Sequence, residues 1–153
     1  MRRLANPEPE PAVDATAQEL RRTLDLLLPI RRQRLNRSER QLREQEQALR
    51  QLEEQRERAD EQLHERQQRY QQLKAGFAQQ NCGVRQASYL LERALEQEQQ
   101  ALKNVHGGRL TLQEIDRAQL ERQQHVEEAR QETRQRQREV EKLEFLLQQE
   151  VNE

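Results

Sequence analysis

The feature that most constrains this chain is an apolar residue repeated every seven positions in a sequence with little else that is apolar. Spacings of three, four and seven place such residues on a narrow strip along a helix. One partner helix covers a strip of this width, which cannot enclose a substrate. The pattern therefore predicts a coiled coil that contacts other proteins, and not an enzyme. The strip, called the seam here, comprises Leu35, Leu42, Leu49, Leu52, Leu63 and Leu73 in a first limb and Leu112, Ile115, Val126, Val140, Leu143 and Leu147 in a second.

Composition agrees with this prediction. Only 32% of the 153 residues are hydrophobic and 36% are charged, a balance that also occurs in disordered chains. A heptad kept over many repeats argues for order, or for ordering on a partner. The net charge of −1 gives no overall attraction to nucleic acid, and no segment is apolar over the length that a membrane span requires. Cys82 is the single cysteine, so no internal disulfide forms and we expect a cytoplasmic setting.

Prolines and glycines divide the chain into an arm and a helical region. Residues 1–15, where three prolines alternate with acids, predict a disordered arm, and residues 16–152 predict helix. Pro29 predicts a break or kink, and Gly107–Gly108 predicts the sharpest break in the chain. The expected helices span about 17–28, 30–77, 84–105 and 112–151.

Two pairs of residues have the spacing of a capping box, in which a threonine and a glutamate three positions later start a helix. These pairs are Thr16 with Glu19, and Thr111 with Glu114.

The distribution of charge favours an antiparallel hairpin. The stretch from Arg31 to Arg43 holds arginines against one acid, Glu39, whereas acids outnumber Lys142 from Glu139 onward. Folding the chain back brings these ends together, and a parallel pair would place arginine against arginine. We therefore predict an all-α fold, a long antiparallel two-helix coiled coil with a shorter connecting helix. The hairpin turn lies either within 76–84 or within 106–109.

Several core-facing positions of the seam hold polar residues. Such residues lower stability while they fix the register of a coiled coil, and arginine can extend its charged head to water. A coil of this kind gains stability when a partner binds it, and alone we expect a monomer or a weak dimer. The positions are Ser38, Gln45, Arg56, Arg66, Gln119, Arg122, Thr133 and Arg136.

No set of residues has the spacing of a catalytic, metal or phosphate site. His64, His106 and His125 lie far apart, and none makes a metal-ligand spacing with Cys82. Gly107–Gly108 lacks the pattern of a phosphate-binding loop. The sequence therefore predicts no catalytic residue, no metal and no cofactor.

A basic helix followed by leucine heptads is also the arrangement of a basic-zipper DNA binder. Acids from Glu39 onward interrupt the flanks of the seam, and no asparagine-rich signature for reading bases is present. The second long helix has no role in that design. A protein-facing or ion-paired surface is the favoured interpretation, and a self-associating scaffold is a further alternative.

The stretch from Leu28 to Arg40, LPIRRQRLNRSER, resembles the opening of the central-stalk proteins of bacterial type III secretion, the YscO/HrpO group. That group is similar to FliJ of the flagellar export apparatus. Its first helix begins with arginines that recur every three residues before a glutamate, as Arg31, Arg34, Arg37 and Glu39 do here. Size, composition and two long helices agree over roughly residues 20–152, while the proline-rich start and Gly107–Gly108 depart from the pattern.

The resemblance implies an antiparallel coiled coil at the cytoplasmic side of the inner-membrane secretion apparatus, similar in shape to the stalk of F-type ATPases. The paired chain ends of such proteins enter the pore of a hexameric export ATPase. The opposite tip contacts the cytoplasmic domain of the export gate, and some members bind secretion chaperones. By position in the hairpin, the ATPase-facing residues would be Arg31, Arg32, Arg34, Leu146 and Leu147, and the gate-facing or chaperone-facing residues Tyr70, Phe77 and Tyr89.

Overall fold

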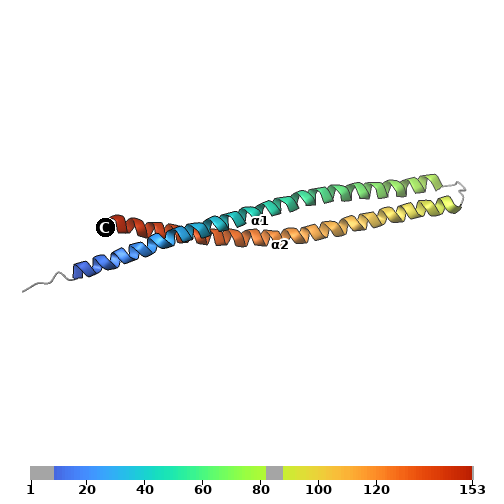
Figure 1. The fold of residues 1–153 in the computed structure, drawn as a ribbon. Helices are drawn as coiled ribbons and strands as arrows, with labels where there is room; N and C mark the ends of the chain where they lie inside the picture. Colours follow the sequence, from blue (N-terminus) through green and yellow to red (C-terminus); the bar gives the residue numbers. More distant parts are fainter. Residues whose placement is uncertain (1–8, 82–87, 153) are drawn as a thin grey trace, which may run out of the picture. The chain divides into compact units, whose positions relative to one another are not determined.

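The computed structural model describes residues 9–81 and 88–152, with side chains over 15–79 and 88–149. These ranges form two helices, α1 (Pro9–Asn81) and α2 (Ser88–Asn152), which are labelled in Figure 1. Both helices are rich in Gln, Glu, Arg, Leu and Ala, the residues that fit a helix best. The described ranges contain no strand.

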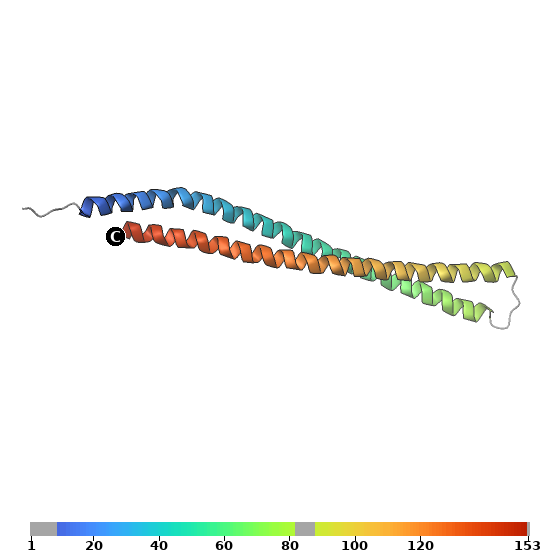
Figure 2. The same cartoon turned by 90° about the horizontal axis from the view of Figure 1, so that it is seen from below.

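The two helices pack on each other within two compact units. One unit comprises Met1–Glu46 and His125–Glu153, and the other comprises Gln47–Gln124. In each unit, a segment of α1 lies beside a segment of α2 that runs in the opposite direction, as Figure 1 and Figure 2 both show. The prediction of an all-α, antiparallel two-helix hairpin is confirmed.

Contacts between the helices define their register. Arg31 Nη1 lies 3.3 Å from Glu139 Oε2 in the first unit, and Arg66 Nη1 donates to the carbonyl oxygen of Asn104 at 3.1 Å in the second. The two residue numbers add up to 170 in both cases. A near-constant sum is the property of an antiparallel pair, because one number rises as the other falls. In the seam itself, the neighbouring residues Leu63 and Gly108 have numbers that add up to 171. Two residues whose numbers add up to about 171 are therefore called level with each other below.

Burial follows the heptad along both helices with one exception. From Leu91 to Leu147, α2 buries or half-buries a residue at alternating steps of three and four, as a 3.5-residue repeat requires. The same alternation runs along α1 from Leu24 to Phe77, where Arg66 alone is exposed. The most buried apolar residues are Leu24, Ala59, Leu63, Ala101, Val105, Val126, Val140 and Leu143.

The break predicted at residues 106–109 is wrong, because α2 continues through Gly107 and Gly108. Gly108 occupies a seam position, and a Cβ atom built on it would lie 3.1 Å from Leu63 Cδ1. The glycine therefore permits close packing at this level. Thr111 does not cap a helix either, since its Oγ1 donates to the carbonyl oxygen of Gly107 one turn earlier at 3.0 Å.

No separate connecting helix is present among the described residues. The helix predicted over 84–105 corresponds to the first part of α2, which begins at Ser88, while residues 84–87 lie outside the described ranges. The chain passes from α1 to α2 between Asn81 and Ser88. Of the two turn positions left open above, the one at 106–109 is therefore excluded.

Of the break or kink predicted at Pro29, the break is wrong, because α1 runs through this residue. Pro29 and Asp25 are exposed, so the carbonyl oxygen that lacks an N–H donor at Pro29 lies on a face open to water. The neighbouring Leu24 is only 5% exposed, and its packing holds the helix across the proline. Because α1 begins at Pro9, Thr16 does not start it; residues 9–15 of the predicted arm are helical, and residues 1–8 lie outside the described ranges.

Candidate interaction surfaces

At five levels of the seam, a large side chain of one helix lies level with a small one of the other. Gly108 receives Leu63 in this way, and the register places four further pairs of this kind in the two units. The seam is therefore filled within the chain, and partners must bind other faces. The further large–small pairs are Leu42 with Ala129, Ala59 with Leu112, Tyr70 with Ala101, and Phe77 with Ala94.

The polar seam residues follow a second rule, in which a long polar side chain lies level with an aliphatic one. The exception is Ser38, which is level with Thr133; both are small and buried. The Thr133 hydroxyl donates to the carbonyl oxygen of Ala129 at 2.8 Å and so satisfies its own hydrogen bond. The long polar residues predicted in the seam and their level partners are Gln45 with Val126, Arg56 with Ile115, Arg66 with Val105, Gln119 with Leu52, Arg122 with Leu49, and Arg136 with Leu35.

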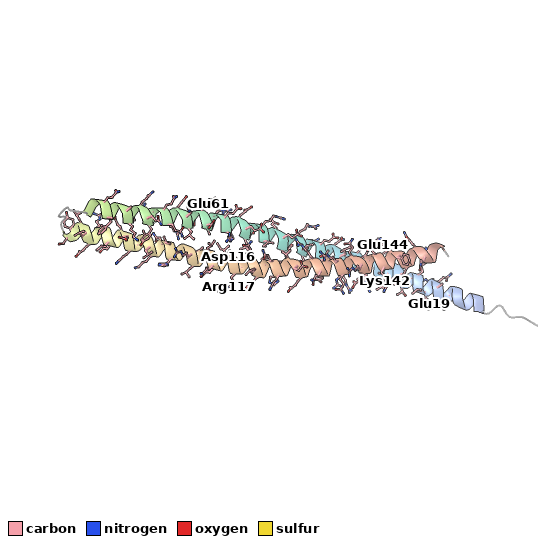
Figure 3. All side chains as sticks on the ribbon, turned by 180° about the vertical axis from the view of Figure 1, so that it is seen from behind. Glu19, Glu61, Asp116, Arg117, Lys142 and Glu144 are labelled. Carbon is pink, nitrogen blue, oxygen red and sulfur yellow. The ribbon has the colours of Figure 1, made fainter. Side chains whose placement is uncertain are left out.

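The arginine-rich stretch of α1 meets the acidic end of α2. Arg32 Nη2 lies 3.1 Å from Glu144 Oε1, and Glu139 Oε2 lies 3.3 Å from Arg31 and 3.4 Å from Arg136. These contacts confirm the charge pairing predicted from the sequence. Figure 3 labels Glu144 on this part of α2.

The rest of the arginine-rich stretch stays open to a partner. Four arginines are exposed, and none forms an ion pair with another described residue. The stretch therefore divides into two arginines that hold the helix pair and four that face outward. The outward arginines are Arg34, Arg37, Arg40 and Arg43.

Exposed apolar side chains lie near these arginines in the same unit. Leu26 is 72% exposed and is level with Phe145, which is 58% exposed. Exposure of both side chains to water is unfavourable, and a region of clustered exposed apolar side chains is typical of a surface that binds another protein. Its other exposed large apolar residues are Leu20, Ile30 and Leu146.

The residues that the resemblance assigned to the ATPase and to the export gate differ in burial: some lie in the seam and others are exposed. Leu147 is half-buried in the seam, whereas Arg34 and Leu146 are exposed. Among the residues assigned to the gate or to chaperones, Tyr70 and Phe77 are half-buried in the seam. Tyr89, at the second position of α2, is 68% exposed.

An ion pair links the helices in the second unit. Arg56 Nε donates to Asp116 Oδ1, and this hydrogen bond together with the charge of Asp116 raises the pKa of the Arg56 guanidinium above its ordinary value. Asp116 lies on the side of α2 that faces α1, whereas Arg117 points away (Figure 3). A surface groove of about 410 Å³ adjoins the pair and is lined by Arg56, Asp116, Gln119, Leu120 and Gln123.

Two seam residues that were not predicted from the sequence lie close to the predicted breaks. Leu24 precedes Pro29, and Ala101 precedes Gly107–Gly108, so each was assigned to a separate short helix. The alternation of three and four residues does continue through both places, and that signal could have identified them.

The described part of the chain offers no group of three or more His, Cys, Asp or Glu side chains that could hold a metal ion. None of the helices described has a stretch long and apolar enough to cross a bilayer. Comparison of the chain with models of known families, with curated proteins and with solved structures gives no match.

Proposed function

We propose that this chain is a cytoplasmic central stalk of a bacterial type III secretion system, peripheral to the inner membrane. In this role it couples a hexameric export ATPase to the export gate and can bind secretion chaperones. The observation that carries the proposal is a set of exposed arginines, Arg34, Arg37, Arg40 and Arg43, that form no ion pair with another described residue. The set lies partly within the stretch that resembles the family. The antiparallel hairpin is the fold which that family uses.

The geometry indicates which arginines are available to the ATPase. Arg31 and Arg32 already contact Glu139 and Glu144, so their replacement disturbs the helix pair as well as any interface. Arg34 is exposed without an ion pair among the described residues, and so its replacement reports on the partner alone. The engagement of Arg31 and Arg32 also weighs against a basic zipper, in which such arginines contact DNA.

The test is the hydrolysis rate of the purified export ATPase of the same secretion system with and without this chain. We expect a complex and a changed rate, and Arg34→Glu should weaken both. Arg69→Glu is the matched control, because Arg69 is also exposed without an ion pair among described residues but lies in the other unit. Absence of a complex and of any rate change would favour the scaffold without an ATPase partner.

A second measurement addresses the gate. Tyr89 is the most exposed aromatic side chain among the described residues, and exposed aromatic residues are common anchors of protein interfaces. We expect Tyr89→Ala to weaken binding to the cytoplasmic domain of the export gate. Phe145→Ala is the control, since Phe145 is 58% exposed but belongs to the other unit.

A further inference from the structure

One part of the seam in the Gln47–Gln124 unit is polar at three successive levels. At each of these levels, a long polar side chain of one helix lies level with an aliphatic side chain of the other. Arginine and glutamine keep their polar ends hydrated, so such a level stabilises a helix pair less than two leucines do. The polar stretch, as it is called here, consists of Leu49 with Arg122, Leu52 with Gln119, and Arg56 with Ile115.

Burial along the helices is lowest over the polar stretch. On α2, Val105 is 2% exposed and Val126 is 3% exposed, whereas every seam residue from 112 to 122 is only half-buried. On α1, the seam residues 49, 52 and 56 are half-buried, and the next one, Ala59, is buried. The polar stretch therefore contributes less apolar burial than the levels of Ala59 and Val105.

The surface of the unit is hollowed at the same place. The groove of about 410 Å³ is lined by two residues of the seam, Arg56 and Gln119, together with Asp116, Leu120 and Gln123. A groove of this volume has room for several water molecules. Water therefore has access to two seam side chains in the polar stretch, where the fewest apolar contacts hold the helices together.

An ion pair crosses from α1 to α2 within the polar stretch. Arg56 Nε donates to Asp116 Oδ1, and each of the two side chains is 44% exposed. A pair that is open to water in this way is weak and is screened by salt. The Arg56–Asp116 contact can therefore both hold the polar stretch closed and release it.

We propose that the polar stretch opens reversibly while the levels of Ala59 and Val105 stay packed, and that the Arg56–Asp116 ion pair is the latch that keeps it closed. Local opening of this kind occurs where few buried apolar contacts hold a segment. Opening uncovers the aliphatic seam residues of the polar stretch beside Leu120, which is already 65% exposed. The latch thereby sets how often this unit presents an enlarged apolar surface.

Amide hydrogen exchange of the full chain, followed by mass spectrometry of its peptides, measures this opening. After correction for the intrinsic rate of each sequence, peptides from residues 49–56 and 115–122 should exchange at least about tenfold faster than peptides around Ala59 and Val105. Equal protection of both sets of peptides would mean that the unit opens only as a whole, and it would overturn the proposal.

Asp116→Asn tests the latch, because it removes the charge and keeps the size of the side chain. Exchange in the polar stretch should become about two- to fivefold faster, as expected for the loss of a surface ion pair. Added salt should have a similar effect on the wild-type chain and little effect on the variant. Glu54→Gln is the matched control, because Glu54 pairs with Arg58 at 3.6 Å in the same part of α1 but within one helix. Equal effects of the two substitutions would show that the Arg56–Asp116 pair is not a latch.

Gln119→Leu tests the cause of the opening. The new leucine lies level with Leu52 and makes one polar level apolar, so exchange in the polar stretch should slow at least about tenfold. Gln113→Leu is the control, because Gln113 is exposed in the same unit and lies outside the seam. Circular dichroism verifies that the variants keep their helix content, and unchanged exchange in Gln119→Leu would overturn the proposal. These measurements use no ATPase, so their results are independent of the stalk function.

Discussion

At the scale of single residues, Gly107 and Gly108 are adjacent in sequence but differ in what surrounds them. A Cβ atom at Gly107 meets nothing within 4 Å, whereas one at Gly108 meets Leu63 Cδ1 at 3.1 Å and Arg66 Nη1 at 3.3 Å. Both glycines have the low helix propensity that led the sequence to predict a break. Only Gly108 has a packing reason to be glycine.

This difference predicts unequal changes in the free energy of unfolding for two small substitutions. Gly107→Ala should raise the free energy of unfolding by about 1 kcal/mol through helix propensity alone. Gly108→Ala should raise it by less or lower it, because the new methyl group must displace the buried Leu63 side chain. Urea unfolding followed by circular dichroism measures both. Equal gains would show that the helices do not approach closely at this level.

Two apolar residues near the end of α2 allow a seam position to be compared with a surface position. Leu143 is 7% exposed and Phe145 is 58% exposed. Leu143→Asp buries a carboxylate and removes a core side chain, so it should lower the free energy of unfolding by at least about 3 kcal/mol. Phe145→Asp should change it by less than about 1 kcal/mol. Thermal unfolding of both variants makes the comparison, and similar losses would contradict the heptad assignment.

At the scale of the helices, the sequence predicted the pairing well and the interruptions badly. The heptad from Leu35 to Leu147 and the opposite charges at Arg31 and Glu139 were sufficient to predict an antiparallel pair. Pro29 and Gly108 were taken as breaks because each disfavours helix locally. Packing along the seam outweighs that local preference, and this packing depends on the register, which single-residue propensities do not contain.

The register itself predicts a specific cross-link. Ser38 and Thr133 are buried at 5% and 9% exposure and lie level with each other. Ser38→Cys combined with Thr133→Cys, in a Cys82→Ser background, should form a disulfide within one chain on oxidation. Ser38→Cys with Val126→Cys is the control, because Val126 lies one heptad away, about 10 Å along the helix. Mobility on a non-reducing gel distinguishes the two outcomes.

At the scale of the whole molecule, α1 has 73 residues and α2 has 65, so at least 138 of the 153 residues are helical. We expect far-UV circular dichroism of the isolated chain to show about nine tenths helix. A much lower helix content that rises when a partner is added would mean that the pair forms only on binding, the possibility which its polar seam residues raised.

The candidate surfaces were only partly visible in the sequence. The arginine-rich stretch was found from composition, but its division depends on the register: Arg31 and Arg32 contact α2, whereas Arg34, Arg37, Arg40 and Arg43 form no ion pair with another described residue. A group of exposed leucines on α2 was not predicted, because Leu95, Leu102, Leu110 and Leu120 recur at uneven steps. They become one sector only when α2 is known to be a single uninterrupted helix.

The matching of large with small side chains has a mechanical consequence. Sliding α2 along α1 by one heptad would bring Arg56 level with Arg122 and Leu63 level with Ile115, so it would replace matched neighbours with two like charges and with two large side chains. Each unit should therefore resist shear along its axis more strongly than a seam of identical leucines, which has a similar fit in every heptad. Within each unit, a load along the axis should therefore pass from one helix to the other without a change of register.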